Sequence, residues 1–122
     1  MERYIDVMDK TLKLSETCLE AIAHIKAKLN EGQFEETSSL MSKVVEGLYH
    51  LEQALPDLLK RLPANNIEQL VQQLQQSLER VVTAYEHAKP GQVQEKLQFS
   101  LQPAFLALHR ELEVALRPYI LS

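Results

Sequence analysis

Histidine is the residue type in this chain with the widest chemical range, because a neutral imidazole binds transition metals and a titrating one moves protons. One histidine lies in each of four segments of helical pattern: His24, His50, His87 and His109. Di-iron helical bundles place inward-facing carboxylates together with a Glu-x-x-His pair on each of two helices. That spacing is absent here, since Glu20 precedes His24 by four residues and Glu46 precedes His50 by four.

The four histidines are not expected to form one site. In an antiparallel arrangement of the segments, His24 and His87 fall near one end of the molecule, whereas His50 and His109 fall near its middle. We therefore expect solvent-exposed helical histidines, no metal site and no cofactor. A metal-binding or enzymatic helical bundle that uses these histidines is the alternative hypothesis.

Two further side chains, Cys18 and Ser15, are candidate nucleophiles, but nucleophilic catalysis needs a base beside the thiolate or hydroxyl in a pocket. Cys18 has no histidine within one helical turn and borders an apolar face, so we expect a small buried side chain. Ser15 is expected to bond to its own helix backbone. The chain has no Gly-rich phosphate loop and no zinc cluster. These patterns predict a non-enzymatic protein without catalytic residues.

Apolar residues recur at spacings of three and four along most of the chain, which predicts four amphipathic helices. The first covers Glu2 to Leu29, the second Gln33 to Leu62, the third runs from Ile67 to Tyr85, and the fourth covers about Gln92 to Tyr119. The second helix has one long seam: Phe34, Met41, Val44, Leu48, Leu51, Leu55, Leu58 and Leu62. Helices of this length joined by short turns favour antiparallel neighbours. The sequence therefore predicts a single all-α domain over residues 1–122, an up-down-up-down four-helix bundle.

Three residues interrupt the helical pattern. Gly47 weakens a helix by up to about 1 kcal/mol relative to alanine, which is explained if another backbone approaches closely there. Pro56 and Pro103 each remove a helical hydrogen bond, so we expect kinks in the second and fourth helices.

The composition narrows the classes of partner. The chain has 122 residues, a formal net charge of -4 and a single cysteine, so no internal disulfide forms. An acidic balance does not attract nucleic acid or an anionic membrane surface. No apolar run approaches the roughly 20 residues of a membrane span, and the residues after Met1 do not resemble a secretory signal. We expect a cytoplasmic protein that binds neither nucleic acid nor membrane.

Six apolar residues are left over for a candidate interaction surface. They lie on the back of the fourth helix and on the wide face of the first: Phe99, Leu106, Ile120, Tyr4, Val7 and Leu14. Together they would exceed the apolar patch that monomers usually expose. The alternatives are that bends at the prolines rotate them inward, or that they are exposed singly and form no interaction surface.

The leading hypothesis is a non-enzymatic protein that acts through protein–protein interaction, either as a homodimer or as an adaptor that binds a partner helix. In size, acidity and helical pattern the chain resembles small bacterial export and flagellar chaperones. That resemblance implies chaperone-like binding of another protein.

Overall fold

The computed structural model describes residues 2–120, with side chains from Tyr4 onward. Its elements, in chain order, are α1 (Glu2–Asn30), η1 (Phe34–Thr37), α2 (Ser38–Leu59), α3 (Ile67–Glu86), α4 (Pro90–Lys96), η2 (Leu97–Leu101) and α5 (Gln102–Ile120). Residues 2–120 contain no strand. The predicted all-α bundle is therefore confirmed. No helix within these residues combines the length and the apolar character that crossing a membrane requires.

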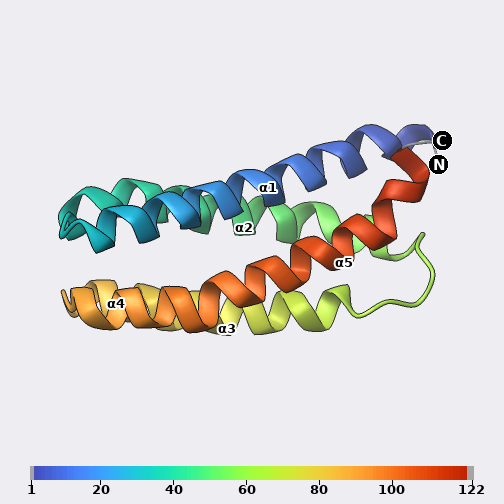
Figure 1. The fold of residues 1–122 in the computed structure, drawn as a ribbon. Coiled ribbons are helices and arrows are strands. Elements are labelled where there is room, and N and C mark those ends of the chain that lie inside the picture. The colour runs from blue at the N-terminus through green and yellow to red at the C-terminus, as the bar shows by residue number, and fades with distance from the viewer. Residues whose placement is uncertain (1, 121–122) are drawn as a thin grey trace.

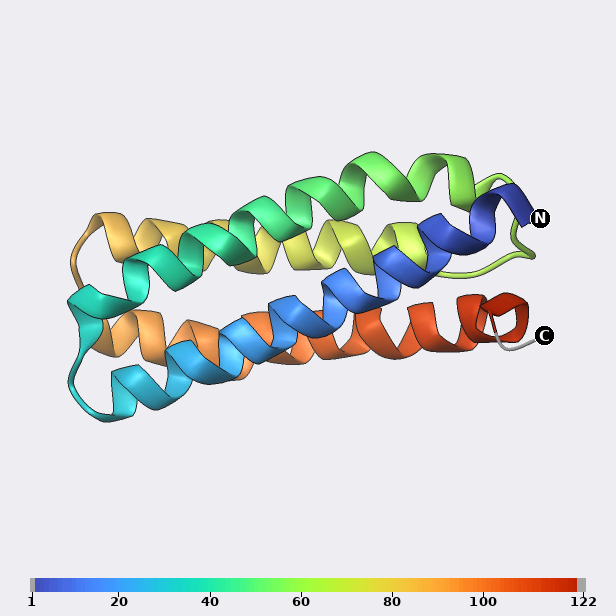
Figure 2. The same cartoon turned by 90° about the horizontal axis from the view of Figure 1, so that it is seen from above.

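The helices form four long rods, the last of which is built from α4, η2 and α5 in succession. Figures 1 and 2 show that consecutive rods run in opposite directions and that both ends of the described chain lie at the same end of the bundle. In Figure 1, α1 lies beside α2, and α3 lies beside the α4–α5 rod. This arrangement brings the middle of α1 against the middle of α5.

The turns between rods follow from particular residues. Gly32 has a positive φ of 76°, which glycine adopts without a Cβ clash, and it ends α1. The Asn65 side-chain oxygen accepts a hydrogen bond from the Ile67 backbone amide at 3.0 Å where α3 begins.

The second rod is shorter than the sequence suggested, because it opens with a tight turn. Residues Phe34–Thr37 form a 3₁₀ helix, and α2 proper covers Ser38–Leu59 instead of Gln33 to Leu62. Thr37 is fully buried, and its hydroxyl donates to the Phe34 carbonyl at 2.6 Å and lies 2.7 Å from the Tyr85 hydroxyl. Thr37 interrupts the apolar seam between Phe34 and Met41, and its hydroxyl is thus satisfied by bonds to Phe34 and to Tyr85 of α3.

Gly47 lies where α2 packs against α1, and the group that approaches it closely is the side chain of Cys18, not the backbone that the sequence predicts. A Cβ added at Gly47 would come 2.3 Å from the Cys18 sulfur, far inside van der Waals contact. Cys18 is buried, as expected. Glycine is therefore the residue that lets these two helices pack at this point.

The two prolines are accommodated differently. Helix α2 continues through Pro56 to Leu59, and the predicted kink there stays a prediction. Before Pro103 the fourth rod widens into a π-helical turn, η2, in which the Gln102 amide bonds to the Leu97 carbonyl. A wide turn suits this position because proline cannot donate to the carbonyl four residues earlier and clashes with it.

The π-helical turn also decides which residues of the fourth rod are buried. The buried apolar residues of the fourth rod are spaced mostly by four: Val93, Leu97, Leu101, Phe105, Leu108, Leu112 and Leu116. In a regular α-helix each step of four turns the side chain by about 40° away from the previous one. The wide turn takes up part of this drift and keeps one side of the rod on the core.

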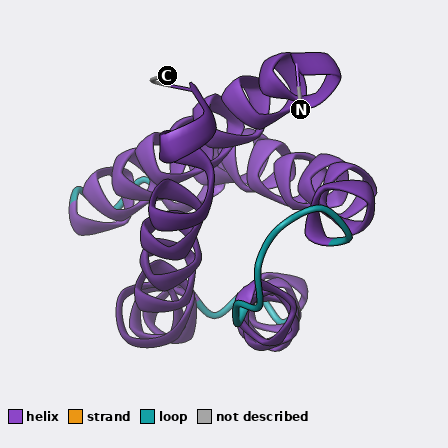
Figure 3. Cartoon of the chain, turned by 90° about the vertical axis from the view of Figure 1, so that its right-hand side faces the viewer, coloured by secondary structure: helices purple, strands orange, loops and turns teal. Residues whose placement is uncertain are grey.

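The four sides of the bundle are not packed equally. Close backbone contacts join α1 to α2, α1 to α5, and α3 to α4 and α5, whereas α2 and α3 hardly approach one another. Figure 3 looks along the bundle from the end that carries the termini, and the loop after α2 crosses a wide interval to reach α3. One side of the bundle is therefore more open than the other three.

Candidate functional site

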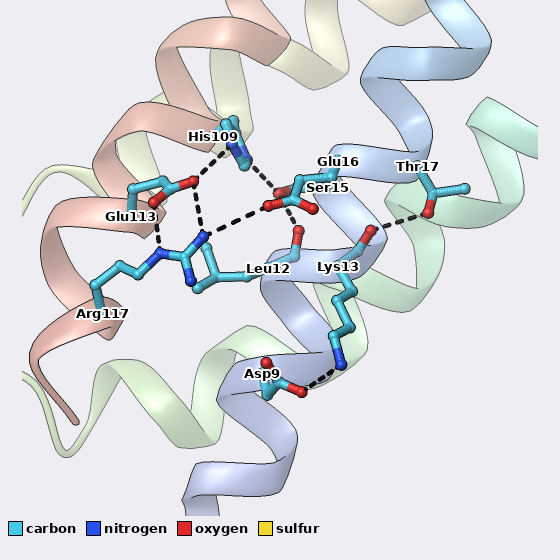
Figure 4. A network of polar contacts seen from close by, with 9 residues as sticks. All are labelled: Asp9, Leu12, Lys13, Ser15, Glu16, Thr17, His109, Glu113 and Arg117. Atoms are coloured by element: carbon cyan, nitrogen blue, oxygen red, sulfur yellow. Dashed lines mark hydrogen bonds and ion pairs between the residues drawn. The ribbon is translucent and has the colours of Figure 1, made fainter. Parts of the chain in front are cut away.

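A polar cluster lies on the packed side, where α1 meets α5 (Figure 4). Ser15 is fully buried; its hydroxyl donates to the Leu12 carbonyl at 2.9 Å and lies 2.6 Å from His109 Nδ1. The other ring nitrogen, His109 Nε2, lies 3.1 Å from a carboxylate oxygen of Glu113. The imidazole thus joins a hydroxyl on α1 to a carboxylate on its own helix.

Arg117 completes this cluster. Its guanidinium donates to both carboxylate oxygens of Glu113, from Nε at 2.7 Å and from Nη2 at 3.3 Å, and Nη2 lies 3.6 Å from Glu16 on α1. The hydrogen bonds and positive charge of Arg117 lower the pKa of Glu113 below its usual value, with His109 adding to the effect. One arginine therefore pairs with two carboxylates across the α1–α5 contact.

The arrangement orders a hydroxyl, an imidazole and a carboxylate as a catalytic triad does. Two features oppose a catalytic role. The Ser15 hydroxyl has no exposed surface through which a substrate carbonyl could approach, and it already bonds to the helix backbone. The cluster is better suited to holding α1 against α5.

The same residues are the ones that could hold a metal ion. Ligand atoms of Glu16, His109 and Glu113 lie within 4.8 Å of one another. However, Arg117 reaches both carboxylates, so a positive charge already lies where a cation would bind. The geometry therefore fits an ion-pair cluster better than a metal centre.

The expectation of exposed histidines is wrong for His109. His24, His50 and His87 are exposed, but the His109 side chain keeps only 13% of its surface. The reason is the antiparallel contact of α1 with α5, which places this imidazole opposite the buried Ser15. The sequence signal was the polar residue Ser15 inside an apolar seam.

Cys18 is the remaining candidate nucleophile of the sequence. It lies beside Gly47 in the α1–α2 contact, and burial raises the pKa of its thiol to about 11. At neutral pH almost no thiolate forms, so the side chain behaves as a small apolar group.

On the open side of the bundle, three neighbouring hollows of about 520, 520 and 580 Å³ lie between α2 and α3. They share lining residues such as Tyr49, Glu52, Gln75 and Val82 and so form one groove. We call it the α2–α3 groove, whose apolar lining consists of Met41, Val45, Leu48, Tyr49, Leu55, Pro56, Leu59, Val71, Leu78, Val82 and Tyr85.

Two side chains of this groove are unusually exposed for their type. Val45 is 41% exposed and Tyr49 is 57% exposed, and they lie one helical turn apart on α2. Leu48, Leu55 and Leu78 form part of the buried core at the base of the groove. The groove therefore has an apolar floor and an apolar wall.

The rim of the α2–α3 groove is acidic. Its charged lining residues are Glu46, Glu52, Glu68, Glu79 and Glu86, against the single basic residue Lys60. Among the side chains that the structure describes, no ion pair involves Glu52, Glu68, Glu79 or Glu86, while Glu46 lies 3.6 Å from His50. Most of these carboxylates thus remain available to an incoming cation.

The six residues of the sequence-based interaction surface are dispersed in the structure. Three of them pack against the core: Tyr4, Leu14 and Ile120. The Arg61 guanidinium carbon also lies over the Tyr4 ring, 4.1 Å from the ring centre. Leu106 is half-buried, whereas Val7 is partly exposed and Phe99 is 72% exposed.

The two most exposed members of that surface do not adjoin. Ser15 contacts His109, so Val7 lies about 12 Å from this contact along the bundle, while Phe99 lies about 15 Å from it in the opposite direction. Phe99 remains a candidate contact residue on its own.

Sequence reasoning missed the α2–α3 groove. The signal was present in Val45 and Tyr49, which flank the seam of Met41, Val44 and Leu48 at a spacing of four. They widen the apolar face of α2 beyond what two neighbours need. The sequence pattern does not indicate that α3 leaves this face of α2 uncovered.

Comparisons with known proteins give one family match. No curated protein matches the chain, and no solved structure matches it. The chain matches a family model described as a domain of unknown function, DUF8042, over residues 6–111. This match spans α1 to α3 and continues into α5, so it includes both walls of the α2–α3 groove. The chain therefore belongs to the DUF8042 family.

Proposed function

We propose that this protein is a non-enzymatic interaction protein that binds an α-helix of a protein partner in the α2–α3 groove. One observation carries the proposal: α2 and α3 make few close backbone contacts, and a groove with an apolar lining lies between them. Binding an amphipathic helix in an apolar groove is a common mode of protein recognition. We also propose that the protein and its partner are cytoplasmic.

The dimensions of the groove support a helical occupant. Helix α2 has 22 residues, which corresponds to about 33 Å at 1.5 Å per residue. A partner helix of about six turns would run the whole length and pack as a fifth rod. Its apolar residues would meet Val45 and Tyr49 and the core leucines between α2 and α3.

A heterologous partner is favoured over a homodimer on this face. A two-fold dimer brings the same patch of both copies together. In that arrangement the glutamates on both walls of one groove would face those of the other, and like charges placed opposite one another are destabilising.

The experiment uses the full chain labelled with ¹⁵N and a synthetic neutral amphipathic peptide of about 20 residues, with leucines on one face and glutamines on the other. We expect amide shift changes confined to α2 and α3 around Val45 and Tyr49. The substitution Val45→Glu places a carboxylate on the apolar wall and is expected to weaken binding at least tenfold.

The matched control is Val114→Glu, the same substitution at a valine of α5 that is 71% exposed. It should bind like the wild type. Phe99→Glu tests the surface suggested by the sequence. Shift changes clustered around Phe99, or equal loss of binding in Val45→Glu and Val114→Glu, would contradict the groove as the binding site.

The alternative, a metal-binding or enzymatic bundle, has the Glu16, His109 and Glu113 cluster in its favour. Metal analysis of protein purified without added metal tests it. Stoichiometric metal that disappears in His109→Ala would favour this alternative over an interaction protein.

A further inference from the structure

We infer that the partner helix of the α2–α3 groove is basic as well as amphipathic, with Lys or Arg side chains on both flanks of its apolar stripe. This inference rests on the proposed function and adds the chemistry of the partner. It is carried by the charge of the groove and by the way that charge is distributed over the molecule.

The groove accounts for the whole net charge of the chain. Five of the 17 acidic residues line it, together with one of the 13 basic residues, which leaves 12 of each sign for the rest of the sequence. The remainder of the chain is therefore balanced. A negative potential concentrated along one apolar groove selects an occupant of opposite charge.

The carboxylates lie on both walls and along the whole length of the groove. Glu46 and Glu52 belong to α2, whereas Glu68, Glu79 and Glu86 belong to α3 and span about 27 Å of that helix. A helix lying between the walls would thus meet carboxylates on both of its sides. This pattern fits a partner whose basic residues flank its apolar face.

Few groups in the α2–α3 groove could offset the charge of its glutamates. Lys60 is the one cation that lines the groove, and it lies beside Pro56 and Leu59 where α2 ends. The glutamines Gln72 and Gln75 provide neutral hydrogen-bonding groups on the α3 wall. Neither feature offsets the glutamates, so acidic helices are expected to be excluded from the groove.

The experiment compares two synthetic peptides of about 20 residues that share one leucine stripe and differ only in carrying lysine or glutamate on its flanks. Binding to the full chain is measured by fluorescence anisotropy of labelled peptide. At low salt we expect the lysine peptide to bind at least tenfold more tightly than the glutamate peptide. The difference should shrink near 1 M salt, where the Debye length falls to about 3 Å.

A charge-reversed variant, Glu52→Lys with Glu79→Lys, tests whether the groove itself makes the choice. It is expected to lose the preference for the lysine peptide or to prefer the glutamate peptide. The matched control is Glu20→Lys with Glu95→Lys, which changes the net charge equally at exposed glutamates of α1 and α4. This control should keep most of the preference for the lysine peptide.

The outcomes separate the two proposals. If neither charged peptide nor the neutral peptide binds, the proposed function fails and the inference fails with it. If both charged peptides bind equally and Val45→Glu abolishes binding, the groove stands and the inference about charge is overturned. Equal loss of preference in the two double variants would also overturn it, because net charge alone would then explain the result.

Discussion

The α1–α5 contact and the α2–α3 groove differ in how the facing sides of two helices are covered. In the first, His109 bonds to Ser15, and Arg117 pairs with Glu16 and Glu113. In the second, apolar side chains remain exposed beside carboxylates that no described cation pairs. One contact is satisfied within the chain, whereas the other is left for something outside it.

This difference shows where net charge carries information. A total of -4 over the chain is unremarkable for a protein of this size. The distribution is informative, because the carboxylates of the α1–α5 contact pair with Arg117, while most carboxylates of the groove have no cation partner among the described side chains. Unpaired charge next to exposed apolar surface is typical of a binding site.

The largest expected effect comes from truncating a buried aromatic ring on the packed side. Phe105 on α5 is fully buried, so Phe105→Ala should lower the free energy of unfolding by about 3–5 kcal/mol. Tyr49→Ala in the groove should change it by no more than about 0.5 kcal/mol, because its side chain is largely exposed. Urea denaturation measures both, and similar losses in the two variants would show that the groove is not open.

The second effect comes from the contact between α1 and α2. Gly47→Ala introduces a Cβ against the Cys18 sulfur, and overpacking of this kind costs about 1–3 kcal/mol. Cys18→Ala in the same chain removes the clash and should recover part of the loss. Gly91→Ala is the control, since nothing lies within 4 Å of its added Cβ. A Gly47→Ala variant as stable as Gly91→Ala would contradict the close packing.

The third effect is a pH dependence of the α1–α5 cluster. Because Arg117 lowers the pKa of Glu113 in the folded state, this pair contributes stability above the usual carboxyl value of 4.5, and that stability is lost as pH falls through the lower folded pKa. Glu113→Gln removes the titrating group. Its melting temperature should therefore fall less than that of the wild type on acidification below 4.5.

Arg117→Gln provides the companion measurement for this cluster. It leaves the carboxyl group but removes the cause of the shift, so its acid-induced loss should also be smaller than in the wild type. If the melting temperature falls equally with pH in the wild type and in both variants, the pair does not contribute to the pH dependence of stability.

The smallest expected effect comes from neutralising the groove. Glu52→Gln with Glu79→Gln removes two carboxylates that no described cation pairs, so the free energy of unfolding should stay within about 0.5 kcal/mol of the wild type or rise slightly. Thermal melts at low and high salt measure this. A clear loss of stability would mean that these carboxylates serve the fold and are not reserved for a partner.

Several features of the fold could be predicted from residues alone. The spacing of Met41, Val44, Leu48 and Leu51 indicated the buried side of α2, and Gly47 indicated a close helix contact. The π-helical turn before Pro103 was not predicted, because the proline suggested a kink and several backbone arrangements can relieve the same clash.

The candidate site was less predictable. The sequence predicts an exposed His109, as for the other three histidines, and only the register of α1 against α5 brings it to Ser15. Val45 and Tyr49 were visible as apolar residues beside a seam. Their exposure depends on α3, which belongs to another part of the chain.

The sequence by itself determined the all-α class, the positions of the four rods and the apolar residues that form most of the core. These follow from local rules, because a spacing of three and four places side chains on one face of any α-helix. The tertiary structure alone decided which helix pairs close and which pair stays open. That choice depends on how faces of different helices fit together, and so the acidic groove between α2 and α3 became apparent only in the folded molecule.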